Sequence, residues 1–139
     1  MFLFRRHPSW FIVTSNVFLL FPILVSFYKE EWIYFIVATT ICFASIGFHY
    51  GFEFYNKKSP ITQSFRILDW LLAIVGTMYV FFYISESTAH IDLKILFAGL
   101  FMLTIGFFWY AFILSDYEKL HPWFHIFSPL VLGFIVLFL

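Results

Sequence analysis

Five long apolar segments dominate this 139-residue chain and constrain its fold more than any other feature. Each is about as long as the roughly 17–25 residues that a helix needs to cross a hydrocarbon core of about 30 Å. Because hydrocarbon offers no partners to backbone N–H and C=O groups, such segments are expected to be helices. We predict spans at Trp10–Tyr28, Trp32–Tyr55, Ile67–Ile84, Leu93–Leu114 and Pro122–Leu139.

The composition excludes water as the solvent for most of the chain. Hydrophobic residues make up 63% of it and charged residues 12%, against about 45–50% and 25% in ordinary soluble domains. A small soluble globule has too little interior to bury 23 Phe, 8 Tyr and 5 Trp. The sequence therefore predicts an all-α, polytopic transmembrane helix bundle that forms a single domain over residues 1–139. Eight basic residues balance eight acidic ones, so no basic field for nucleic acid is expected.

The distribution of Lys and Arg predicts the orientation. Two of them, Lys29 and Lys94, flank the spans on one side, and six flank the other: Arg5, Arg6, Lys57, Lys58, Arg66 and Lys119. The positive-inside rule then places the N-terminus in the cytoplasm and the C-terminus outside. The first apolar run is too long for an ordinary signal-peptide core and no small-residue cleavage pattern follows it, so we expect a retained helix.

Polar and ionisable residues within the apolar spans are the candidate functional residues, because such groups are costly inside a membrane. The second predicted span contains Ser45 and His49, the third opens with Asp69, and the last opens with His121 and His125. Successive spans alternate in direction, and a helix rises about 1.5 Å per residue, so the three histidines and Asp69 lie within roughly two turns of one membrane face. We therefore expect them in one layer near the cytoplasmic face.

The spacing of these residues favours a metal site. Ser45 and His49 are four residues apart, as are His121 and His125, so each pair projects from one helical face. Three imidazoles from two helices can bind zinc at about 2.0–2.1 Å and leave a fourth position for water, as in catalytic sites. Asp69 could accept a hydrogen bond from that water or orient a ligand, and Ser45 could hold the water or a substrate oxygen. Small residues would let the second and third helices approach closely: Gly47, Gly51, Ala73 and Gly76.

Taken singly, these residues also have plain structural interpretations. His49 could be an interhelical hydrogen-bond donor, Asp69 could pair with Arg66, and Ser45 could simply pack between helices. His121 could be an interfacial histidine. The site hypothesis depends on the three histidines and Asp69 sharing one layer.

Pro122 bears on whether His121 can be a ligand. A residue that precedes proline is biased away from helical dihedral angles, so His121 could sit at a helix cap without sharing the face of His125. Alternatively, Ser115 and Glu118 form a capping-box pattern that would start the helix earlier.

The order of these residues resembles that of the CREST superfamily of membrane proteins, which includes alkaline ceramidases and the adiponectin and progestin receptors. The resemblance rests on Ser45-x3-His49, Asp69 and His121-x3-His125, and not on any long stretch of sequence. In that family the three histidines bind zinc, and the Ser and Asp lie beside the metal-bound water. The resemblance implies an intramembrane hydrolase that cleaves an amide or ester bond of a lipid such as ceramide.

The number of helices departs from the family pattern. Members usually have seven helices, three of them between the Asp helix and the last His helix, whereas this chain has one there. A chain with two helices fewer still has its last helix running in the same direction across the membrane, so the same site can form. The walls of the pocket cannot be the same, and a second copy of the chain could supply the missing wall.

Three functions are consistent with the sequence. The first is a zinc-dependent lipid hydrolase that uses Zn²⁺ bound by His49, His121 and His125, with Asp69 and Ser45 as catalytic residues. The second is a receptor or membrane remodeller in which a structural zinc is closed by Asp69 as a direct fourth ligand. The third is an electron carrier whose haem takes His49 and His125 as axial ligands. The sequence favours the hydrolase.

Overall fold

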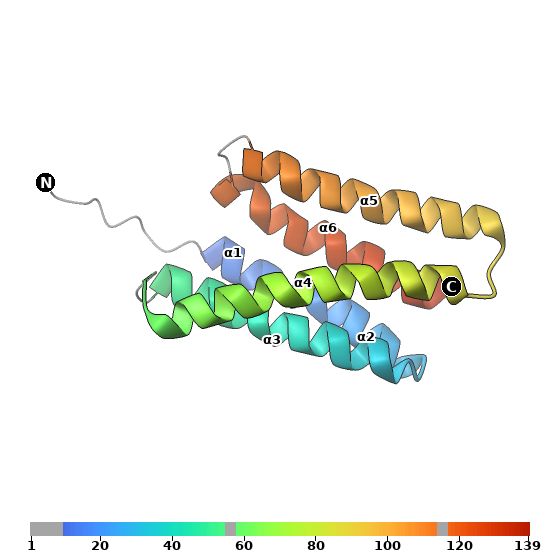
Figure 1. The fold of residues 1–139 in the computed structure, drawn as a ribbon, viewed down its shortest axis with the longest axis horizontal. Helices are drawn as coiled ribbons and strands as arrows, with labels where there is room; N and C mark the ends of the chain where they lie inside the picture. The colour runs from blue at the N-terminus through green and yellow to red at the C-terminus, as the bar shows by residue number, and fades with distance from the viewer. Residues whose placement is uncertain (1–9, 55–57, 114–116) are drawn as a thin grey trace, which may run out of the picture.

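The chain is a bundle of helices. The computed structural model describes residues 10–54, 58–113 and 117–139, and these contain no strand. Five helical segments are long and apolar enough to cross a membrane, which confirms the predicted all-α polytopic bundle. In chain order the helices are α1 (Trp10–Thr14), the 3-10 helix η1 (Ser15–Leu19), α2 (Leu20–Tyr28), α3 (Trp32–Phe54), α4 (Pro60–Glu86), α5 (Ile91–Ile113) and α6 (Tyr117–Phe138) (Figure 1).

Helix α4 begins at Pro60, so the expected start at Ile67 is wrong. The Ser59 side chain accepts a hydrogen bond from the backbone N–H of Thr62 at 3.1 Å, and proline occupies the first turn, where it needs no N–H partner. The first two turns of α4 are partly polar, so hydropathy does not mark them. Asp69 therefore lies in the third turn of α4 and not at its start.

Helix α6 begins at Tyr117, so the expected start at Pro122 is also wrong. Pro122 lies inside the helix, as membrane helices tolerate because neighbouring groups can satisfy the freed backbone carbonyl. His121 is consequently part of the helix and shares a face with His125. Ser115, half of the capping-box pattern, lies outside the described residues.

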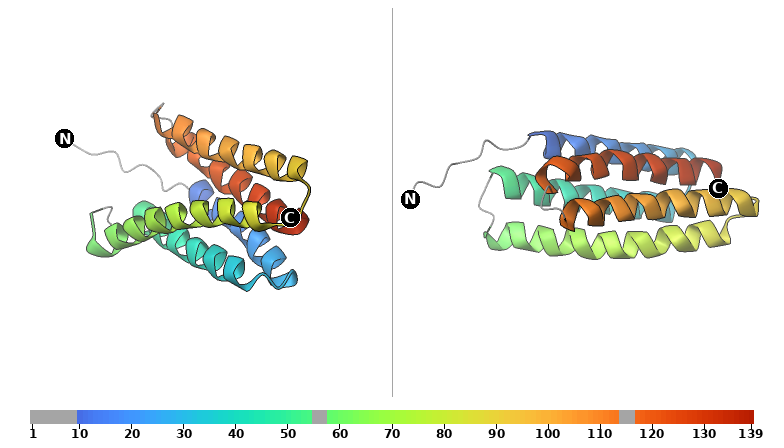
Figure 2. Two further views of the ribbon diagram at one scale, coloured as in Figure 1. Left: turned by 45° about the vertical axis from the view of Figure 1, so that its right-hand side comes forward. Right: turned by 90° about the horizontal axis from the view of Figure 1, so that it is seen from above.

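The helices pack as two pairs with the first segment between them. Helix α4 packs along α3, α5 packs along α6, and the α1–η1–α2 segment lies against both α3 and α6 (Figure 2). Helices α4 and α5 touch each other only sparingly. This arrangement brings the end of α3 and the start of α6 together.

Glycines allow α3 and α4 to approach closely, as expected. A Cβ at Gly47 would lie 2.6 Å from the ring of Phe65, and one at Gly51 would lie 2.9 Å from Oγ1 of Thr62. On α4, a Cβ at Gly76 would lie 2.7 Å from Cδ1 of Ile41. Ala73, the fourth small residue, is exposed and takes no part in this packing.

The hydrophobic core lies toward one end of the bundle. It joins residues from the first half of α3, the second half of α4, the first half of α5 and the end of α6, while apolar side chains elsewhere are widely exposed. Such exposure is suited to lipid, which is as apolar as these side chains. The buried core residues are Tyr34, Ala38, Val80, Ile84, Phe97, Phe101, Ile135 and Val136.

Candidate metal centre

Three histidine side chains converge at the end of the bundle opposite the core. His49 lies near the end of α3, and His121 and His125 lie in the first turns of α6. Their Nε2 atoms are separated by 3.2 Å between His49 and His121, 3.0 Å between His49 and His125, and 2.9 Å between His121 and His125. All three side chains are buried, at 1%, 4% and 7% exposure respectively. The three histidines predicted from spacing therefore meet at one point.

The arrangement fits a divalent metal ion. Three nitrogens about 3 Å apart share a point that lies roughly 2.0–2.1 Å from each, the length of a metal–imidazole bond, and about 1 Å outside their plane. A neutral imidazole has one N–H and one lone pair, so three Nε2 atoms cannot all donate to one another. A cation satisfies all three lone pairs at once. The group of His49, His121 and His125 can thus hold a metal ion.

Aromatic rings surround the three imidazoles. The ring of Phe108, from α5, meets that of His121 at 5.7 Å between centroids, and the Phe48 ring lies 4.8 Å from that of His49. Phe124 stacks beside His121 with an angle of 22° between their planes. An apolar surround of this kind limits solvent access and lowers the local dielectric constant at a metal site.

Ser45 lies on α3 one turn before His49, near Asp69 on α4. Its hydroxyl makes no hydrogen bond within the described part of the chain. Ser45 is buried and Asp69 is half-buried. Arg66 is exposed, and no ion pair joins it to Asp69 among the described side chains.

Asp69 is not a member of the ligand group. The three histidine nitrogens all lie within 4.8 Å of one another, and no carboxylate of the described residues belongs to that set. Within the described part of the chain, the cluster thus offers three protein ligands, and the Asp69 carboxylate is not a fourth.

Several buried polar residues were not singled out from the sequence, Asn16 and Ser128 among them. Asn16 in η1 donates from Nδ2 to the backbone oxygens of Ile12 and Val13, at 3.0 and 3.3 Å, while its Oδ1 has no partner among the described residues. Ser128 is buried in α6. Both residues could have been found in the sequence, because both are polar residues within apolar spans.

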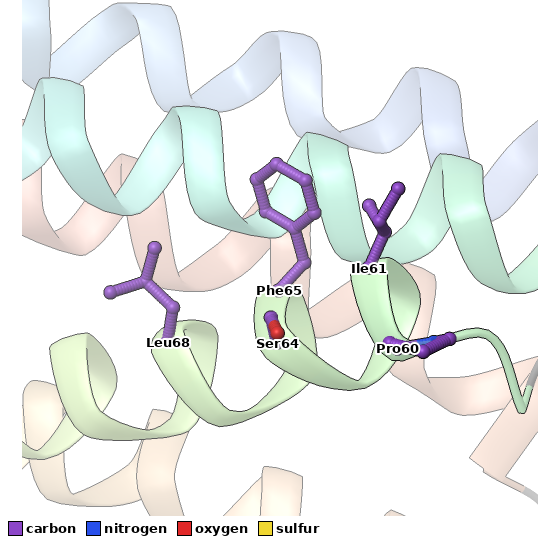
Figure 3. A pocket seen from close by; sticks show the side chains of 5 residues that line it. All are labelled: Pro60, Ile61, Ser64, Phe65 and Leu68. Atoms are coloured by element: carbon purple, nitrogen blue, oxygen red, sulfur yellow. The ribbon is translucent and has the colours of Figure 1, made fainter.

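A shallow surface depression on the first turns of α4 is separate from this centre. It contains none of the predicted site residues, and a single hydroxyl is its only polar side-chain group. Its lining residues, seen in Figure 3, are Pro60, Ile61, Ser64, Phe65 and Leu68.

Comparison of the chain with models of protein families, with curated proteins and with solved structures finds no match. The chemistry of the site itself therefore has to indicate the function.

Proposed function

We propose that this protein is a zinc-dependent intramembrane hydrolase that cleaves an amide or ester bond of a lipid. The observation that carries the proposal is the convergence of the Nε2 atoms of His49, His121 and His125, in a ligand set that contains no carboxylate of the described residues. Three protein ligands and an open position are typical of catalytic zinc, whereas structural zinc normally has four.

The donor set suits zinc. Imidazole nitrogen is a preferred ligand of zinc, though copper, iron and nickel also accept it. Three nitrogens on one side of the ion match a tetrahedral geometry with one position left over. When bound there, Zn²⁺ supplies a Lewis acid that polarises the scissile carbonyl and lowers the pKa of water toward about 7.

Asp69 and Ser45 supply the proton chemistry. Asp69 takes the proton of the attacking water and delivers it to the leaving nitrogen or oxygen, so that the carboxylate is regenerated. Ser45, whose buried hydroxyl has no hydrogen-bond partner within the described part of the chain, is proposed to donate to the nearby Asp69 carboxyl group during the reaction. The apolar rings around the histidines keep bulk water away from the reacting groups.

The substrate we propose is a membrane lipid, because the site is buried in a bundle whose surface is apolar. The site lies toward one end of the helices, where the polar linkage of a lipid meets its hydrocarbon chain. On the predicted topology this is the cytoplasmic face. The resemblance to alkaline ceramidases makes an N-acyl lipid the first substrate to test.

Two other functions fit the site less well. A structural zinc needs a fourth protein ligand, but Asp69 does not join the histidine group. Axial haem ligands stand on opposite sides of the iron, about 4 Å apart for bonds of roughly 2 Å. The 3.0 Å between the Nε2 atoms of His49 and His125 leaves no room for a porphyrin.

The proposal is tested by assaying the purified, zinc-loaded protein in vesicles for fatty-acid release from a panel of N-acyl and O-acyl lipids. Asp69→Asn should retain zinc and lose activity by about 100-fold or more, as expected when a general acid–base group is removed. Asp92→Asn is the control, since Asp92 is exposed at the start of α5. Stoichiometric zinc without release of fatty acid from any lipid would instead support the non-catalytic alternative.

A further inference from the structure

Helices α4 and α5 are joined by a short connection but make few contacts with each other. Each packs along a different partner, α3 and α6 respectively, and they touch each other only sparingly. Figure 1 shows them diverging away from the short connection at residues 87–90, so that they are farthest apart at the end where α4 begins. That end also holds the histidines of α3 and α6.

Burial along the two helices follows this divergence. Near the connection, Val80 and Ile84 of α4 and Phe97 and Phe101 of α5 are buried in the core. Toward the other end, no residue of α4 from 63 to 75 and none of α5 from 105 to 110 is buried. The two helices are therefore sealed at one end only.

One aromatic contact spans the two helices at the open end. The rings of Trp70 and Phe108 meet at 6.4 Å in a T-shaped arrangement. Phe108 in turn contacts the His121 ring at 5.7 Å, and Trp70 directly follows Asp69 in the chain. Through Phe108, the exposed Trp70 side chain is thus connected to the metal centre.

We propose that the lipid substrate reaches the metal centre sideways from the bilayer, between α4 and α5, with Trp70 and Phe108 as the gate. This inference rests on the proposed function. The occupant is one hydrocarbon chain of the lipid, because the flanking residues of α4 are exposed and apolar, including Leu71 and Ile74. A hydrocarbon chain that enters there stays among apolar side chains, while the polar linkage of the lipid reaches the level of Asp69.

The gate explains how a buried site could accept a long lipid. A single ring pair is a weak contact and can separate, whereas the core contacts near the connection hold the helices together. Trp70 and Phe108 would then also select substrates, since a bulkier chain requires a wider separation of the two rings.

A reversible cross-link tests the gate. In a Cys42→Ala background, which removes the only cysteine, Trp70→Cys and Phe108→Cys are joined by a short reducible bis-thiol reagent. The matched control joins Phe81→Cys and Phe101→Cys, since the Phe81 and Phe101 rings bridge the same helices at 5.5 Å near the connection. Zinc content is measured in every variant, and hydrolysis is measured with a long-chain lipid in vesicles and a short, water-soluble analogue.

We expect the Trp70–Phe108 bridge to lower long-chain hydrolysis by about tenfold or more, with zinc content and short-analogue hydrolysis unchanged and full recovery on reduction. The control bridge should change neither activity. Unchanged long-chain hydrolysis, an equal loss with both substrates, or a bridge between two copies of the chain would each overturn the gate. If the zinc-loaded wild type hydrolyses neither substrate, the proposed function fails and the gate with it.

Discussion

The Nε2 atoms of His49 and His125 lie 3.0 Å apart, although 76 positions separate the two residues in the sequence. One residue comes from the end of α3 and the other from the start of α6. Two buried nitrogens held so close, with a third 2.9 Å from one of them, bring three lone pairs to one point. A compact cation is the simplest partner for that arrangement.

Haem should be absent from the purified protein. The Nε2 atoms of His49 and His125 are too close to be axial ligands on opposite faces of a porphyrin. We expect no Soret band in the absorption spectrum of protein expressed with added haem precursor. A stoichiometric Soret band that His125→Ala abolishes would contradict this account.

Ser45→Ala should lower the turnover number by about tenfold with little change in KM or zinc content. The proposed role of the hydroxyl is to donate to the nearby Asp69 carboxyl group, so its loss affects proton transfer more than substrate binding. Steady-state kinetics on the best lipid substrate measure the effect.

Ser85→Ala is the matched control for Ser45→Ala, because Ser85 lies on α4 far from the histidines and its hydroxyl donates to the Phe82 backbone oxygen. This variant should behave like the wild type. A loss of zinc in Ser45→Ala, or equal losses of activity in both variants, would remove the proposed role of Ser45.

Chelation should lower the thermal stability of the protein. Binding to the folded state at a thousand times the dissociation constant stabilises it by about 4 kcal/mol, and the ligands come from two different helices. We expect the melting temperature in detergent to fall on zinc removal and to recover on zinc addition. The same treatment should leave His49→Ala unchanged, and an equal shift in that variant would place the stabilising metal elsewhere.

Gly133→Ala should destabilise the bundle by about 1–3 kcal/mol, as expected for an overpacked contact. A Cβ at Gly133 of α6 would overlap the ring of Phe21 on α2. Gly106→Ala is the control, because a Cβ at that position of α5 meets nothing within 4 Å. Unfolding in mixed micelles should separate the two variants; equal stability would show that the Phe21 ring moves aside freely.

Much of the site could be predicted because a membrane restricts where each residue can lie. Alternating spans fix which helix ends share a face, and four-residue spacing fixes which side chains share a helical face. Those two constraints predict that His49, His121 and His125 come together, while Pro122 leaves open in the sequence whether His121 shares the face of His125. They also predict Asp69 on the neighbouring helix in the same layer as the histidines.

The rest of the site depends on features that cannot be predicted from the hydropathy of the sequence. The starts of α4 at Pro60 and α6 at Tyr117 lie in polar turns, which look like loops on a hydropathy scale. The contact of Phe108 with His121 depends on which helices are neighbours. The periodicity of an apolar span does not indicate which helices are its neighbours, because lipid and protein neighbours are equally apolar.

The central claim is that three imidazoles bind one ion, and metal analysis of the purified wild type beside His125→Ala tests it most directly. His90→Ala is the control, since His90 is exposed and pairs with Asp92 at the far end of the bundle. The account predicts about one zinc per chain in the wild type and in His90→Ala, and a large loss in His125→Ala. A wild type without stoichiometric metal after zinc loading, or a His125→Ala variant that retains it, would contradict the account.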